Sequence, residues 1–142
     1  MHKQKGKAGI PLLLLVIALS AAVYYIVLSF SEGKVLSPGS IDGYVLIPSI
    51  LRSEEISRLG KVRNYYYSAA DGPKPRIASV NIMTYKQKET VHQQVRRYFL
   101  SMGFKENEDH ELWNGKQEVS VSFEKNEERG WIVDIALLDH IN

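Results

Sequence analysis

The densest group of side chains that could do chemistry lies in one short segment after position 105. Carboxylates and an imidazole of this kind can bind divalent cations; they are Glu106, Glu108, Asp109, His110 and Glu111. The segment lacks the spaced ligands and the turn glycine of an EF-hand loop. Charged residues also keep edge strands from pairing with other chains. We interpret the segment as a solvated loop or strand edge and predict no metal site.

Acid–base catalysis would need polar residues from distant parts of the chain to converge in one cleft, for example His92, Glu111 and Asp134. The adjacent carboxylates Glu54 and Glu55 would diverge on a helix. Acidic residues in the first turn of a helix are already explained by their favourable interaction with the helix dipole. The chain has no glycine-rich phosphate loop, no G-x-S-x-G and no H-E-x-x-H. The absence of cysteine excludes disulfides and thiolate chemistry. We predict no catalytic residue and no cofactor.

Charge is placed unevenly along the chain. The net charge of +2 comes from the N-terminal end, where Lys3, Lys5 and Lys7 lie. The remainder from Val35 onward is close to neutral and has no basic stripe, which argues against nucleic-acid binding. Arg96 and Arg97 could form an anion site on a helix, but we favour a solvated helix face, because no further basic residues converge within a helical turn.

An uncharged, apolar stretch runs from Ala8 to Ser31. As a helix it would be roughly 36 Å long, enough to cross a hydrocarbon core of about 30 Å. The lysines before it predict a cytoplasmic N-terminus by the positive-inside rule. A cleaved signal peptide is the alternative, with small residues at 20–22 as the cleavage site. We favour an uncleaved anchor, because cleavage there would leave the apolar run 23–28 exposed.

These features predict four parts: a basic cytoplasmic tail at 1–7, a transmembrane signal-anchor helix at 8–31, a linker at 32–43 and an extracytoplasmic domain at 44–142. Turn formers at 37–40 support the linker. Lack of both cysteine and N-x-S/T sequons suits a bacterial envelope protein, periplasmic in a Gram-negative cell. The predicted localisation is the cell membrane, with a single pass.

The domain pattern predicts an α+β fold. We expect a first strand at Tyr44–Pro48, a short helix capped by Ser49 or Ser53 that ends before Gly60, and a hairpin of strands 62–68 and 76–85. Apolar residues at helical spacing predict a long helix over 91–102, with a Schellman stop at Gly103 and Phe104.

Three segments, 111–113, 116–123 and 131–138, complete an antiparallel meander, in which a two-residue type I′ turn at Asn114-Gly115 joins the first two. The expected sheet is therefore covered by one long and one short helix. The element order resembles ferredoxin-like arrangements only as an analogy of order.

A candidate partner surface comes from places where strand alternation fails. In the last strand, the face opposite Trp131 and Val133 carries Ile132 and Leu138 and is not polar, so it needs cover. Tyr65 and Tyr67 would join it if their strand has the matching register; otherwise they are ordinary strand residues packed with their hydroxyls in water.

The preferred hypothesis is a non-catalytic, membrane-anchored interaction module that serves an envelope complex, with a protein partner or a second copy bound at Tyr65, Tyr67, Ile132 and Leu138. A small-ligand-binding or sensing domain is the first alternative. An apolar pocket lined by the tyrosines and Trp113 would support it. An enzyme of unknown class is the second.

Overall fold

The computed structural model describes residues 9–30, 33–127 and 130–140. The chain divides into two compact units, with the boundary after Phe30. The two units are described separately below.

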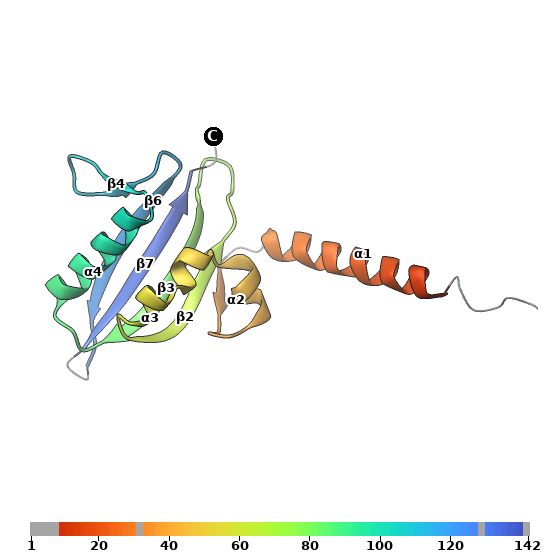
Figure 1. Ribbon diagram of the computed structural model, residues 1–142, viewed down its shortest axis with the longest axis horizontal. Coiled ribbons are helices and arrows are strands. Elements are labelled where there is room, and N and C mark those ends of the chain that lie inside the picture. Colours follow the sequence, from red (N-terminus) through yellow and green to blue (C-terminus); the bar gives the residue numbers. More distant parts are fainter. Residues whose placement is uncertain (1–8, 31–32, 128–129, 141–142) are drawn as a thin grey trace, which may run out of the picture. The chain divides into compact units, whose positions relative to one another are not determined.

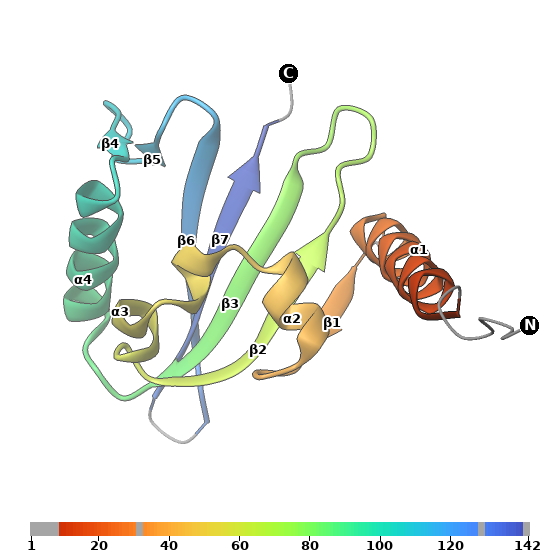
Figure 2. The same cartoon turned by 45° about the vertical axis from the view of Figure 1, so that its right-hand side comes forward.

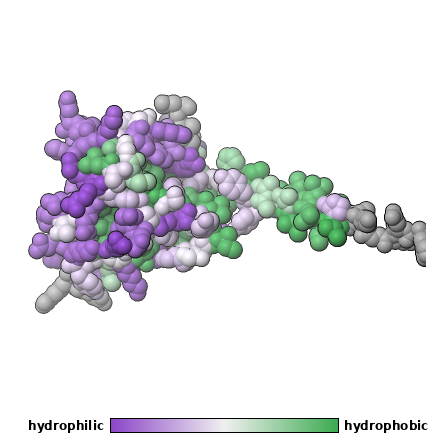
Figure 3. All heavy atoms as spheres, in the orientation of Figure 1, coloured by the Kyte–Doolittle hydropathy of each residue, from purple (hydrophilic) through white to green (hydrophobic). Residues whose placement is uncertain are grey.

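The described residues of the first unit form one helix, α1 (Gly9–Ser29). Residues 10–29 carry no charged side chain and are long and apolar enough to cross a membrane. Most of their side chains are exposed, and Figure 3 shows the helix as predominantly hydrophobic. The helix is therefore compatible with a membrane anchor, and also with a signal sequence, because an N-terminal signal sequence can meet the same criteria of length and hydropathy.

The second unit is built on a seven-stranded antiparallel sheet in the order β1-β2-β3-β7-β6-β5-β4. The strands are β1 (Lys34–Leu36), β2 (Lys61–Ser68), β3 (Arg76–Thr84), β4 (Lys105–Glu106), β5 (Leu112–Trp113), β6 (Gln117–Lys125) and β7 (Trp131–Asp139). Strands β1 to β3 form one meander and β4 to β7 a second, and the last strand returns to pair with β3. The α+β prediction is confirmed in this form, and the order is not that of a ferredoxin-like fold.

All the helices of this unit pack on one face of the sheet (Figures 1 and 2). They are α2 (Ile41–Leu46), the 3-10 turn η1 (Ser49–Arg52), α3 (Glu54–Ser57) and α4 (Lys88–Ser101). The long helix buries Val91, Val95 and Phe99 against the sheet, as its periodicity predicts. The Tyr98 hydroxyl donates to the Ile50 carbonyl at 2.9 Å and ties α4 to η1.

Helix ends follow the sequence signals. The Ser53 hydroxyl accepts from the Ile56 amide at 3.3 Å, which caps α3. At the end of α4, Phe104 N–H donates to the Phe99 carbonyl and Gly103 N–H to the Leu100 carbonyl, both at 3.1 Å. Gly103 has a φ of +91°. These are the two bonds of the predicted Schellman motif, which is confirmed.

The predicted first strand at Tyr44–Pro48 is wrong. Most of this segment belongs to α2, because the Ser40 hydroxyl accepts from the Gly43 amide at 3.1 Å and starts a helix there. Tyr44 is 72% exposed, so the apolar run is not a buried strand. The first strand is instead β1, inside the segment expected as a linker at 32–43, where Val35 pairs with Tyr66.

The predicted two-residue type I′ turn at Asn114-Gly115 is also wrong. Such a turn needs positive φ at both residues, but only Gly115 has it, at +91°. The hairpin is longer, with Asn114 N–H donating to the Gln117 carbonyl at 3.1 Å. The Asn114 side chain accepts from the amides of Lys116 and Gln117 at 3.1 and 2.7 Å. The asparagine thus shapes the loop through its side chain rather than through a left-handed backbone.

Candidate functional site

The four proposed partner residues do not share one face of the sheet. Tyr65 and Tyr67 lie opposite Val80 and Ala78 of β3, on the face that the helices cover. They are 8% and 4% exposed and belong to the hydrophobic core. Ile132 and Leu138 lie on the opposite face, so the register condition for joining the tyrosines to them is not met. Tyr66, between the two, lies on the side of Ile132 and Leu138.

We call this second side the open face, because no helix of the described domain covers it. Its central strands β3 and β7 contribute eight side chains, half of them large and apolar: Ile77, Ser79, Asn81, Met83, Ile132, Asp134, Ala136 and Leu138. All but Ser79 are half-buried by their neighbours. The short helix α3 does not cover this face, since Ile56 and Leu59 belong to the core on the other side of the sheet.

A small polar cluster occupies the middle of the open face. The register places Asp134 between Asn81 of β3 and Ser122 of β6. The Ser79 hydroxyl donates to Asp134 Oδ1 at 3.0 Å. Asn81 Oδ1 is buried and has no hydrogen-bond partner. A half-apolar surface with a polar cluster at its centre is suited to a partner that supplies hydrogen-bond donors.

Asp134 carries an electrostatic cost in this position. Burial raises its pKa above the usual value, and the hydrogen bond from Ser79 only partly opposes this shift. The sequence signal for the cluster was available but unused: Ser79 and Asn81 alternate with core residues of β3, and they share a face with Asp134. Recognising it required the pairing of β3 with β7.

This shift predicts how stability depends on pH. A raised folded-state pKa contributes stability below the unfolded pKa of aspartate, about 4, and that contribution is lost as pH rises through the folded pKa. Asp134→Asn should therefore gain stability relative to the wild type as pH rises from about 4 to about 7. Urea unfolding of both chains across this range measures the difference. A difference that stays constant with pH would contradict the assignment.

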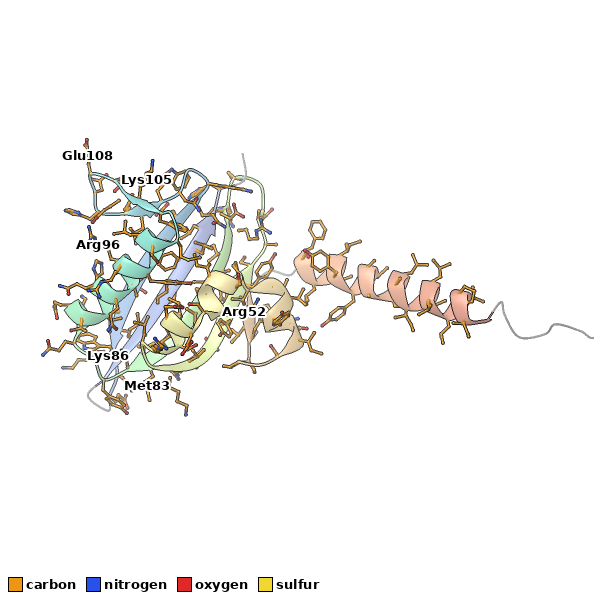
Figure 4. The ribbon with its side chains drawn as sticks, viewed as in Figure 1. Arg52, Met83, Lys86, Arg96, Lys105 and Glu108 are labelled. Carbon is orange, nitrogen blue, oxygen red and sulfur yellow. The ribbon has the colours of Figure 1, made fainter. Side chains whose placement is uncertain are left out.

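Side chains of the acidic segment after position 105 form hydrogen bonds and ion pairs with one another and with α4. Arg96 on α4, labelled in Figure 4, forms an ion pair with Glu106. His110 Nδ1 lies 3.0 Å from the other oxygen of the same carboxylate. The hydrogen bonds from Arg96 and then from His110 hold the pKa of Glu106 below its usual value. The side-chain amide of Asn107 donates to the Glu111 carboxylate at 2.9 Å. Within the described residues, no group of three possible ligands is arranged to hold a metal ion.

The three residues considered for catalysis do not converge. His92 and Glu111 line the same cleft of about 200 Å³, between α4, the segment before β5 and the strand β6. Asp134 does not line this cleft, because its side chain is on the open face. Ser120 also lines the cleft, but the register places its side chain on the open face, opposite Ala136 and away from His92.

A larger groove of about 710 Å³ lies between α4 and the segment containing η1 and α3. Its lining mixes apolar side chains with three basic ones, Arg58, Lys86 and Arg97. The Lys86 ammonium is held by the Arg58 carbonyl at 2.7 Å and by Gln94 at 3.2 Å. The tyrosines 65–67 and Trp113, which were expected to line a ligand pocket, do not line this groove.

Comparison with known proteins adds no assignment. No protein-family model matches the chain, and searches of curated proteins and of solved structures find no significant match.

Proposed function

We propose that this chain is a non-catalytic interaction module, anchored in a bacterial cell membrane by its N-terminal helix, whose domain binds a protein partner outside the cytoplasm through the open face. The single observation that carries the proposal is the uncovered, half-apolar side of β3 and β7. Such a module would serve as an accessory or assembly subunit of an envelope complex.

The anchor and its orientation rest on the first residues of the chain. An uncharged helix of 21 residues matches the thickness of a bilayer core. Three lysines before it and a single one beside Glu32 after it favour a cytoplasmic N-terminus. The domain then lies on the outer side of the membrane, which is the periplasm in a Gram-negative cell.

Partner binding by the open face is supported by its composition. Sheets that face water on one side carry polar residues there, whereas Ile77, Met83, Ile132 and Leu138 are apolar. At the centre, Asp134 is half-buried despite its charge. A carboxylate at a cost in stability is typical of a surface that is completed by a second molecule, because a donor from that molecule would satisfy it.

The groove beside α4 is the feature that favours the alternative of a small-ligand-binding domain. Its size falls in the range of small-molecule sites, and it combines an apolar floor with a few polar groups. Three basic side chains against the single acidic Glu55 in the lining would favour an anionic ligand. This reading leaves the uncovered sheet face without a role, so we place it second.

The proposal can be tested by photo-crosslinking in membranes. We expect a photoreactive amino acid at Ile132 or Leu138 to give a discrete adduct, since both positions lie on the open face. The same amino acid at Gln93, an exposed position on the outer side of α4, is the matched control and should give only background. An adduct of twice the mass of the chain would identify a second copy as the partner.

Equal yields from all three positions, or no adduct from the two open-face positions, would contradict binding through this surface. The adduct should also remain in the membrane pellet after alkaline extraction, as expected for an anchored chain. Its release would instead favour a cleaved signal sequence.

A further inference from the structure

Strand β6 has an unpaired outer edge. Its ladder to β5 covers only Glu118 and Val119, whereas its ladder to β7 runs along the whole strand from Gln117 to Lys125. Within the residues that the structure describes, no strand pairs with the outer edge of 120–125. Figure 2 shows β5 at one end of β6 and α4 alongside β6.

Backbone direction along β6 can be read from its first hydrogen bonds. The Gln117 carbonyl accepts from Asn114 on the β5 side, and the Lys116 carbonyl accepts from His140 on the β7 side, both at 3.1 Å. Successive residues of a strand point their backbone groups to alternate sides. The N–H and C=O groups of Val121 and Phe123 therefore point outward, where an added strand would bond to them.

A groove accompanies this edge on its helix side. Val119, Ser120 and Val121 line the cleft of about 200 Å³ together with His92, Val95 and Arg96 of α4. Further along, the Lys88 ammonium lies over the Phe123 ring, 5.1 Å from its centroid. An extended chain laid along β6 would thus place every second side chain between the strand and α4.

The charge of the groove wall differs between its two ends. Lys88, His92 and Arg96 recur at i, i+4 and i+8 along the flank of α4 that faces β6. Arg96 is neutralised by Glu106, and Glu111 and Glu118 lie at the same end of the cleft. Glu89 also lies near Lys88 and His92 on the outer side of the helix. The Phe123 end therefore offers an apolar floor beneath a basic side chain.

We propose that the outer edge of β6 at 120–125 and the facing flank of α4 form a binding site for an extended protein segment, which adds to the sheet as a strand. The segment would place an apolar side chain opposite Val121 and an acidic one beside Lys88. Strand addition of this type uses main-chain bonds for affinity and side-chain pockets for specificity. The site is separate from the open face, and it adds a second contact to the function proposed above.

A simpler interpretation of this edge is that Glu124 and Lys125 only protect it from aggregation through their charges. They lie at the end of the strand, however, and leave the outward groups of Val121 and Phe123 without such protection. The cleft beside these residues would have no counterpart in a merely protected edge.

The test uses the full chain in detergent micelles and a short fluorescent peptide in which threonine alternates with valine and aspartate. We expect saturable binding that slows amide hydrogen exchange at Val121 and Phe123, measured by NMR. A peptide with lysine in place of aspartate should bind more weakly because it meets Lys88. A peptide N-methylated at alternate amides should lose binding by about tenfold or more, since it cannot bond to the strand edge.

The protein side is tested with a matched pair of variants. Val121→Pro removes the outward N–H, whereas Val121→Ala shortens the side chain and keeps the N–H. Only the proline variant should lose binding, and Ile132→Ser on the open face should retain it, which separates this site from the open face. No binding of the aspartate peptide, or equal binding of its N-methylated form, would overturn the proposal. Self-association that depends on Val121 and excludes the peptide would overturn it in favour of a second copy.

Discussion

Replacing Phe99 with alanine should lower the free energy of unfolding of the domain by about 3–5 kcal/mol. Phe99 is fully buried, and its ring contacts those of Tyr98 and Phe104 edge-on, each at a centroid distance of 5.2 Å. Truncation would therefore remove apolar area and leave a cavity between α4 and the sheet. Urea unfolding of the purified chain, followed by tryptophan fluorescence, measures the loss.

Gln93→Ala on the outer side of the same helix is the control, and it should change the free energy of unfolding by no more than about 0.5 kcal/mol. The two substitutions have nearly equal helix propensity, so their difference reports the packing of the inner face. Similar losses from both would show that α4 does not hold the sheet through Phe99.

The elements with strong periodicity were predictable from the sequence. The spacing of Val91, Val95 and Phe99 leaves one orientation for α4, and Gly103 with Phe104 defines where it ends. The alternation in β7 places Val133, Ile135 and Leu137 in the core in the same way. In these segments local preference and tertiary packing agree, so one pattern suffices.

The first strand failed because a short apolar run has no period of its own. The sequence pattern of Tyr44 and its neighbours predicts a strand, but the Ser40 side chain caps a short helix there. β1 was not predicted because it is defined by its pairing with β2 and not by a local sequence pattern. It has three residues, and its only strong feature is the pairing of Leu36 with Tyr65 across the edge of the sheet.

Only one half of the candidate site could be predicted from the sequence. Ile132 and Leu138 follow from the alternation of β7, and they do lie on the uncovered side. The face of the tyrosines depends on the register of β2, which shifts between Val62 and Asn64. A one-residue slip moves every side chain to the other face, so the sequence alone could not place Tyr65. The polar cluster around Asp134 likewise exists only once β3 and β7 are paired.

The orientation of the chain in the membrane decides which molecules the two candidate surfaces can meet. Our proposal places the N-terminal lysines in the cytoplasm and the sheet domain outside. The physical basis is the asymmetry of flanking charge, since Lys3, Lys5 and Lys7 precede the apolar helix, whereas only Lys34 follows it, two residues after Glu32. The nearly neutral domain presents no further barrier of charge to export.

A reporter fused after the domain should therefore give an all-or-none result. Alkaline phosphatase, which is active only outside the bacterial cytoplasm, should be fully active, whereas a fluorescent protein that matures only in the cytoplasm should stay dark. Replacing Lys3, Lys5 and Lys7 with glutamine weakens the charge asymmetry, so part of the population should invert and the phosphatase activity should fall. Lys61→Gln, Lys74→Gln and Lys116→Gln together remove the same charge from the domain, far from the helix, and should leave the activity unchanged. Bright fluorescence of the unmodified fusion would place the domain in the cytoplasm, and both surfaces would then need cytoplasmic partners.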